Sequence, residues 1–206
     1  MVRFVLSQGV TQFLDLGCGL PGVGAVHEIA SPINPNARVL YVDDDPVAVE
    51  YCREVLRDRR VDGARACRVD LVDVDAVLTA ADRWLKLDEP VAVLMIAVLH
   101  FVPDSPEFDK ALDRYVDTMA PRSFLAISHA TADADPDRLG SAAKLYEASS
   151  IPFVARSYEQ VEALFRNTTL VDPGLVWAPL WRTESGDDIG DAKASACYAG
   201  VGQTRV

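Results

Sequence analysis

The sequence lacks any apolar stretch long enough to cross a membrane. Its longest apolar run, from Val91 to Leu99, falls well short of the roughly 20 residues that a membrane-spanning helix needs. The first residues also lack the extended apolar stretch and cleavage site of a secretory signal peptide. We therefore expect neither a membrane span nor an export signal.

Positive charge is scarce as well. The 206 residues include 31 acidic side chains and 20 Lys or Arg side chains, which gives a formal net charge of −11. A surface of this charge repels phosphate backbones and anionic lipid. Nucleic acid and membrane surfaces are therefore not expected as partners.

Cysteine and histidine are also few. The four cysteines (Cys18, Cys52, Cys67 and Cys197) have no C-x-x-C spacing, and the three histidines add no spacing typical of metal ligands. We expect reduced thiols, which predicts a reducing compartment and a cytoplasmic location, and we expect no bound metal. No Ser-His-Asp arrangement is apparent.

What the sequence does contain is a regular alternation of short apolar runs and segments of helical period. Strands are expected at residues 12–16, 38–42, 64–71, 91–98, 123–128, 175–181 and 196–201. Helices are expected at residues 23–33, 46–57, 74–87, 108–119, 138–149 and 157–165, with a polar loop at 183–194. Five β–α units followed by two strands predict an α/β fold, with a mostly parallel, doubly wound sheet and an antiparallel last strand. No linker divides the chain, so residues 1–206 are expected to form one domain.

A glycine-rich turn follows the first strand, at the edge where open α/β sheets bind ligands. Gly17, Gly19 and Gly22 permit a tight turn and a close approach of the backbone to a ligand. Taken alone they fit the G-x-G-x-x-G pattern of a dinucleotide site, and they also fit a plain strand-to-helix connection.

Acidic residues at three successive strand ends narrow the choice of ligand. Asp15, just before the first glycine, would repel a pyrophosphate but suits an ammonium group. Asp43 ends the second strand, where carboxylates commonly hold ribose hydroxyls, and Asp44 could assist it. Asp70 ends the third strand, where it could accept a hydrogen bond from an adenine amino group. Although strand ends often carry Asp, and Asp45 has the position of a helix cap, the set suits a cationic nucleoside such as S-adenosylmethionine.

At this point the sequence resembles the class I S-adenosylmethionine-dependent methyltransferases. It is most similar to a bacterial family of S-adenosyl methyltransferases that was once catalogued as a domain of unknown function. The matching motifs are FLDLGCGLP (13–21), VHE (26–28), YVDDDP (41–46), AVLHFVPD (97–104), SHAT (128–131) and YAGVG (198–202).

The resemblance implies a Rossmann-like sheet of seven strands in the order 3-2-1-4-5-7-6, with S-adenosyl-L-methionine as cofactor. It implies that Asp15, Gly17 and Gly19 hold the methionine part, Asp43 the ribose and Asp70 the adenine. Further cofactor contacts are expected from Gly22, Asp44, Leu71 and Ala97.

The sequence departs from the family pattern in two places. Pro21 stands where the broad class usually has its third glycine, which shifts the turn toward Gly22. Members of the closer family usually carry a helical segment ahead of the first strand, whereas only Met1 to Thr11 precede it here. We therefore expect an exposed methyl group, slow turnover unless a partner supplies a lid, and exposed apolar surface that favours a homodimer.

Two histidines are candidates for a general base, which methyl transfer needs only if the nucleophile must lose a proton. His100 follows the fourth strand and His129 ends the fifth. These strands are neighbours in the implied order, so both imidazoles are expected near the mouth that holds the methyl group. Alternatively, His100 packs beneath Phe101 and His129 bonds to a loop backbone. A third histidine, His27, is expected to make a structural contact or a bond to the cofactor end.

Aromatic side chains are candidates for an apolar acceptor pocket, although aromatic residues in late strands commonly belong to the core. They are Phe101, Tyr146, Trp177 and Trp181.

The leading hypothesis is a methyltransferase that acts on a small-molecule acceptor. One alternative is a non-catalytic module that binds S-adenosylmethionine and acts as a partner or regulator. Another is an NAD-dependent oxidoreductase, which Asp15 disfavours.

Overall fold

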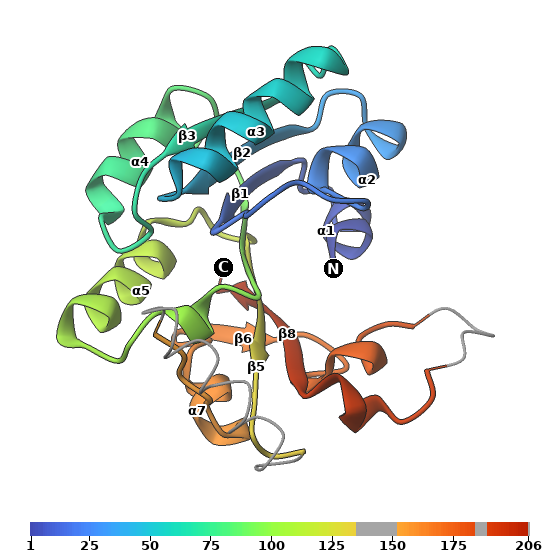
Figure 1. The fold of residues 1–206 in the computed structure, drawn as a ribbon, viewed down its shortest axis with the longest axis vertical. Coiled ribbons are helices and arrows are strands. Elements are labelled where there is room, and N and C mark those ends of the chain that lie inside the picture. The colour runs from blue at the N-terminus through green and yellow to red at the C-terminus, as the bar shows by residue number, and fades with distance from the viewer. Residues whose placement is uncertain (135–151, 184–188, 206) are drawn as a thin grey trace.

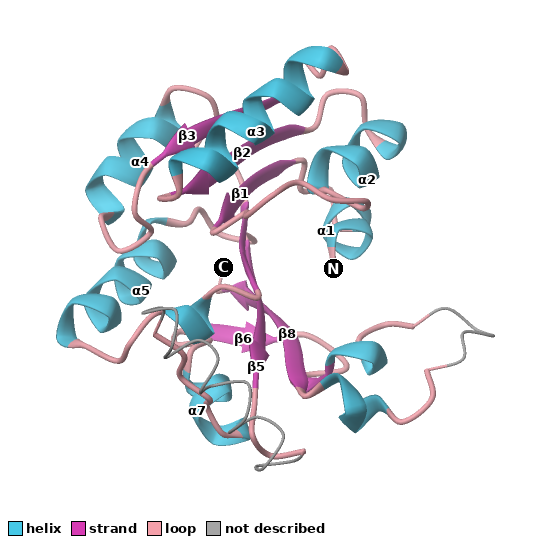
Figure 2. Ribbon diagram, in the orientation of Figure 1, coloured by secondary structure: helices cyan, strands magenta, loops and turns pink. Residues whose placement is uncertain are grey.

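An eight-stranded sheet forms the centre of the computed structural model, which describes residues 1–134, 152–183 and 189–205 (Figures 1 and 2). The sheet order is β3-β2-β1-β4-β5-β8-β6, and β7 also pairs with β8. Strands β1 to β5 are parallel, and β8 runs antiparallel to β5. The strands are β1 (Gln12–Leu16), β2 (Arg38–Asp43), β3 (Ala64–Arg68), β4 (Ala92–Ile96), β5 (Phe124–Ala130), β6 (Thr168–Leu170), β7 (Val176–Trp177) and β8 (Cys197–Thr204).

Helices cover both faces of this sheet. The α-helices are α1 (Val2–Ser7), α2 (Val26–Ile33), α3 (Pro46–Asp58), α4 (Val74–Asp82), α5 (Pro106–Thr118) and α7 (Tyr158–Ala163). The described residues also contain three 3₁₀ helices, η1 (Leu99–Phe101), η2 (Ala178–Leu180) and η3 (Ala192–Ser195). Buried residues of α4, α5 and α7 form one core cluster with one face of the sheet, and those of α1, α2 and α3 form a second cluster with the other face. This is the doubly wound arrangement that the alternating pattern predicts.

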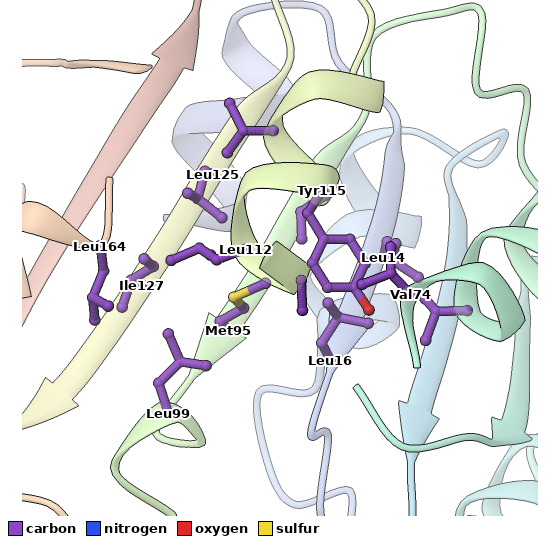
Figure 3. Close-up of a cluster of buried hydrophobic side chains, with 14 of the residues drawn as sticks. Leu14, Leu16, Val74, Met95, Leu99, Leu112, Tyr115, Leu125, Ile127 and Leu164 are labelled. Carbon is purple, nitrogen blue, oxygen red and sulfur yellow. The ribbon is translucent and has the colours of Figure 1, made fainter. Parts of the chain in front are cut away.

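Side-chain alternation along the strands explains how both faces are filled. In β1, Leu14 and Leu16 belong to the cluster beneath α4 and α5, whereas Phe13 belongs to the opposite cluster. Leu112 and Tyr115 of α5 lie one turn apart on its buried face, and Figure 3 shows Tyr115 beside the leucines of β1 and Leu112 beside Met95 of β4. A strand that is buried on both faces reads as a continuous apolar run, which is why β4 was recognisable from sequence.

Local capping sets where the helices begin. The Asp45 carboxylate accepts a hydrogen bond from the Val47 N–H at the start of α3, with Pro46 in the first turn, as the sequence predicts. The Ser105 hydroxyl accepts one from the Phe108 N–H, so α5 begins at Pro106, two residues earlier than expected.

The sheet order and the antiparallel last strand are confirmed, but the sixth strand is not one continuous strand. In place of the strand expected at 175–181, β6 and β7 each pair with β8, and η2 follows β7 directly. Pro179 lies in η2 and has no N–H to donate, so the strand cannot continue through it. The helix expected at 23–33 begins only at Val26. The expected helix at 138–149 lies outside the described residues.

Candidate functional site

A cavity of about 620 Å³ opens at the carboxyl ends of the parallel strands. Its wall includes seven of the predicted cofactor-binding residues, namely Gly17, Gly19, Asp43, Asp44, Asp70, Leu71 and Ala97. The remaining wall residues come from the segments after β3 and β4 and from Pro152. Residues from four different strand ends therefore meet at one cavity.

The other two predicted residues, Asp15 and Gly22, line adjoining cavities. Asp15 borders a cavity of about 350 Å³, to which Gly17 also contributes. Gly22 and Asp15 both line a smaller one of about 180 Å³. Because Gly17 borders both the 620 Å³ and the 350 Å³ cavities, the cavity that Asp15 lines adjoins the large one at the glycine turn.

The glycine turn packs tightly against the segment after β4. Gly17 has a φ of 69°, and a Cβ at this position would lie 2.1 Å from a methyl carbon of Val98. Its N–H donates to the Val42 carbonyl at 2.8 Å, which ties the turn to β2. Gly19 also has a positive φ, of 57°, but a Cβ there would meet nothing within 4 Å. Gly17 is therefore required for both its conformation and its packing, and Gly19 for its conformation alone.

The Asp43 carboxylate organises this turn. One of its oxygens accepts a hydrogen bond from the Gly19 N–H at 2.8 Å, and the other accepts from the Asp45 N–H at 3.0 Å. A carboxylate oxygen has two lone pairs, so both oxygens retain capacity for hydroxyl donors. Sequence reasoning assigned Asp43 to ribose but did not foresee that it also fixes the turn.

Asp15 is a partly buried carboxyl group with no cationic partner among the described residues. No residue in the described ranges donates a hydrogen bond to it or forms an ion pair with it. Burial, together with the nearby Asp43 charge, raises the pKa of Asp15 to about 7. A carboxyl group in this state gains most from a ligand that brings a positive charge.

The rest of the cavity provides acceptors beside apolar surface. The Asp70 carboxylate accepts from the Val72 N–H at 3.0 Å and lies next to Leu71 and Val72 in the wall. Ala97 has a left-handed backbone with a φ of 56°, and its N–H donates to both the carbonyl and the hydroxyl of Ser128. Such strain in a non-glycine residue is a feature of functional sites, and no local pattern in the sequence signals it.

The two candidate catalytic histidines are neighbours, as the strand order predicted. Their ring centroids lie 5.5 Å apart. However, neither imidazole lines the cavity: His129 is fully buried and His100 is 7% exposed. Both were expected near the mouth of the site. The chain after β4 turns into η1 and packs His100 against Phe101, so a residue of the cavity wall lies beside His100 while the imidazole itself does not line the cavity.

Hydrogen bonds hold His129 in one neutral state. Its Nδ1–H donates to the Ala130 carbonyl at 2.6 Å, and its Nε2 accepts from Arg156 Nη1 at 2.8 Å. Burial first, and the Arg156 charge with it, lowers the pKa of both His129 and His100 to about 4. These imidazoles are weak bases that water and ligand do not reach easily.

The other predicted residues have structural surroundings. The His27 ring and its backbone N–H both hydrogen-bond to the Tyr41 hydroxyl, which is the structural contact expected of it. Phe101 lines the cavity, whereas Trp177 stacks on Tyr198 and Trp181 is buried against α1. Tyr146 lies outside the described residues. The described part of the chain contains no cluster of three or more side chains suited to a metal ion.

One buried residue at the site was missed by sequence reasoning. Arg156 is 2% exposed and bonds to the segment after β4. A single arginine before a helix carries no local signal of such a role, because all its partners lie more than twenty residues away in the chain.

The strand order, the glycine turn and the carboxylates at successive strand ends define the α/β fold of the S-adenosylmethionine-dependent methyltransferases. The chain belongs to the S-adenosyl methyltransferase family, whose profile matches residues 1–205. It is a methyltransferase, and its cofactor is S-adenosylmethionine. No curated protein matches the sequence.

Solved structures agree with this assignment. A DUF574 family protein from Streptomyces avermitilis is 31% identical, with a TM-score of 0.88 over 98% of this chain and 79% of its own. A Thermobifida fusca protein assigned as a methyltransferase has the same identity and TM-score, over 100% of this chain and 79% of its own. The N-methyltransferase NodS from Bradyrhizobium japonicum, in complex with S-adenosylhomocysteine, shares the fold at 20% identity, with a TM-score of 0.60 over 98% of this chain and 83% of its own. No helix in the described residues is long and apolar enough to span a membrane.

Proposed function

We propose that this protein transfers a methyl group from S-adenosylmethionine to a small-molecule acceptor, with the nucleoside in the 620 Å³ cavity and the amino-acid part at Asp15. The observation that carries this proposal is the Asp15 carboxyl group. It lies beside the glycine turn, has no cationic partner in the described ranges and has a pKa raised to about 7. The cofactor's ammonium group supplies the charge that this site lacks.

The surrounding residues fit the remaining parts of the cofactor. Asp43, assisted by Asp44, would accept hydrogen bonds from the ribose hydroxyls, since its oxygens keep free lone pairs. Asp70 would accept one from the adenine amino group. The backbone at Gly17, Gly19 and Gly22 would allow the methionine part to approach closely, and Leu71 and Ala97 offer apolar surface to the base.

The bound cofactor supplies an already activated methyl group, so the protein's task is orientation and exclusion of water. Good alignment corresponds to effective molarities of roughly 10⁵–10⁸ M. The catalytic roles of His100 and His129 stay predictions, and their low pKa values and burial weigh against them. If the nucleophile of the acceptor is already deprotonated, or loses its proton to solvent, neither histidine is needed as a base.

Several finer features belong to the same proposal. The four cysteines are free in the structure, which supports a reducing, cytoplasmic setting. Leu20, Val23 and Ile96 are exposed beside the cavities around Asp15, which supports an apolar acceptor or a homodimer contact there. The methyltransferase relatives weigh against a non-catalytic binding module.

Calorimetry with S-adenosylhomocysteine tests the proposal. Asp43→Ala removes charge-assisted hydrogen bonds worth about 1.5–3 kcal/mol each, so the affinity should fall at least about tenfold. Asp45→Ala is the matched control: it removes the α3 cap and lowers stability by about 1 kcal/mol, yet leaves the affinity near wild type. Binding of NAD but not S-adenosylhomocysteine would overturn the proposal, and a methyl-release assay over a metabolite panel would identify the acceptor.

A further inference from the structure

Arg156 is a buried cation that the proposed chemistry does not use. It lies just before the capping residue of α7 and is only 2% exposed. A buried guanidinium group is costly unless its donors are paired. The groups that accept hydrogen bonds from this guanidinium therefore indicate the role of the residue.

The guanidinium group of Arg156 bonds to the turn that follows β4. Nη1 donates to the Leu99 carbonyl at 2.7 Å, and Nη2 donates to the Val102 carbonyl at 3.0 Å. Nε and Nη2 both donate to one Asp104 oxygen, at 3.1 and 2.5 Å. These partners extend from Leu99, the first residue of η1, to Asp104 in the loop that follows it.

The same turn forms a wall of the cofactor cavity. The cavity is lined by Phe101, Val102 and Pro103. In the chain these lie between Leu99 and Asp104, both of which accept hydrogen bonds from Arg156. The segment before Arg156 adds a second attachment, since the Val154 N–H donates to the His100 carbonyl at 2.7 Å.

Arg156 also joins this wall to β5. Its Nη1 lies 2.8 Å from His129 Nε2, and its guanidinium carbon lies 5.3 Å from the centre of the Phe108 ring at the start of α5. The Asp104 side chain is 66% exposed, so its ion pair is solvent-screened and contributes little alone. The bonds to the Leu99 carbonyl and to His129 are buried and the bond to the Val102 carbonyl is partly buried, so these are less screened by solvent.

We propose that Arg156 is a positioning residue that holds the Phe101–Pro103 wall against the cofactor through the Leu99 and Val102 carbonyls, using His129 as its fixed support on β5. This inference rests on the proposed function, because it concerns the same cavity. It also gives His129 a role that does not require contact with substrate.

The test measures S-adenosylhomocysteine affinity by calorimetry in wild type, Arg156→Ala, Arg156→Lys and Leu56→Ala. Leu56 lies on the buried face of α3 and does not line the cavity, so Leu56→Ala is a destabilised control with an intact wall. We expect Arg156→Ala to weaken binding at least about tenfold, and millimolar guanidinium to restore part of it. Leu56→Ala should melt at a lower temperature yet bind like wild type when both are folded.

A second readout measures the pKa values of the imidazoles by NMR. The sequence has only three histidines, so their signals can be assigned readily. Arg156 is one cause of the lowered pKa values of His100 and His129, so both should rise in Arg156→Ala. Arg156→Lys keeps the charge but cannot reach all the acceptors, so it should fold and still lose affinity, which covers the case in which the alanine variant does not fold.

The outcomes are separable. If wild type does not bind S-adenosylhomocysteine, the proposed function fails. If wild type binds and the folded Arg156 variants bind equally well, or lose no more affinity than Leu56→Ala, the positioning role is overturned. Failure of guanidinium to restore binding in folded Arg156→Ala would also count against it.

Discussion

At the scale of single residues, burial shifts ionisable groups around the site in opposite directions. Asp15 has a pKa raised to about 7, whereas His100 and His129 have pKa values lowered to about 4. In each case the largest cause is burial, which destabilises the charged form. The carboxyl group therefore keeps its proton to a higher pH, and the imidazoles stay deprotonated to a lower pH. Without cofactor, the protein therefore contains a carboxyl group that a bound cation would stabilise in its ionised form, and two imidazoles that are neutral at physiological pH.

The raised pKa of Asp15 predicts a pH-dependent stability. Between about pH 4 and pH 7 the native apoprotein binds this proton more tightly than the unfolded chain does, so ionisation of Asp15 lowers the free energy of unfolding as pH rises. Asp15→Asn removes this effect. The variant should gain about 2–4 kcal/mol relative to wild type between pH 4.5 and pH 7.5, measured by urea unfolding. A difference that stays constant with pH would contradict the pKa shift.

The histidines predict the opposite slope. Because their folded pKa values lie below 6.5, the native state binds fewer protons than the unfolded chain between about pH 6.5 and pH 4. Stability is lost as pH falls through this range, by up to about 3 kcal/mol for each imidazole. In His129→Gln the amide oxygen can accept the hydrogen bond from Arg156, and the amide cannot be protonated. Its loss of melting temperature between pH 6.5 and pH 4.5 should therefore be smaller than that of wild type.

At the scale of elements, the site depends on how the turn after β1 meets the turn after β4. Gly17 and Val98 are in contact, Asp43 holds Gly19, and Arg156 holds the far end of η1. The turn after β4 has only the short 3₁₀ helix η1 of its own. Both turns are positioned by bonds to neighbouring elements, which is how a cavity at a sheet edge becomes rigid.

A glycine series tests this contact. Gly17→Ala should cost about 2–5 kcal/mol and abolish tight S-adenosylhomocysteine binding, because its Cβ overlaps Val98 and its φ is positive. Gly19→Ala should cost only about 1–2 kcal/mol, since only its conformation is strained. Gly22→Ala has space and an ordinary φ, so its stability should change by less than about 0.5 kcal/mol. Equal stability losses for Gly17→Ala and Gly19→Ala would show that the Val98 contact is unimportant.

At the scale of the whole molecule, the net charge of −11 acts on every encounter with a partner. It favours solubility and discourages association with other polyanions. The acceptor must enter against this field unless it is neutral or cationic.

The charge predicts no useful affinity for nucleic acid. A fluorescently labelled DNA duplex at 0.15 M salt should give no saturable change in anisotropy below about 10⁻⁴ M protein, the weak end of non-specific binding. A titration at lower salt serves as the control, because electrostatic binding strengthens there. Saturable micromolar binding at 0.15 M salt would contradict this prediction.

The sequence by itself determined the order of the elements and the edge of the sheet that carries the site. Alternating strand and helix periods, together with the right-handed β–α–β rule, leave few topologies. The family resemblance implies the strand order 3-2-1-4 among them, and this order brings the carboxyl ends of β1, β2 and β3 to one edge. Asp15 near the end of β1, Asp43 at the end of β2 and Asp70 just beyond β3 could therefore be assigned to one site from the sequence.

Only the tertiary structure decided the features that depend on contacts between distant segments. β6 is too short to carry a periodic signal and exists because β8 offers it hydrogen bonds. His129 was expected near the mouth, yet the orientation of its ring is set by the bond to Arg156. The left-handed backbone at Ala97 is stabilised by hydrogen bonds to Ser128. The physical reason is the same in each case. Local sequence sets backbone preference and burial, whereas the direction of a buried polar side chain is set by whichever partner, however distant in the chain, satisfies its hydrogen bonds.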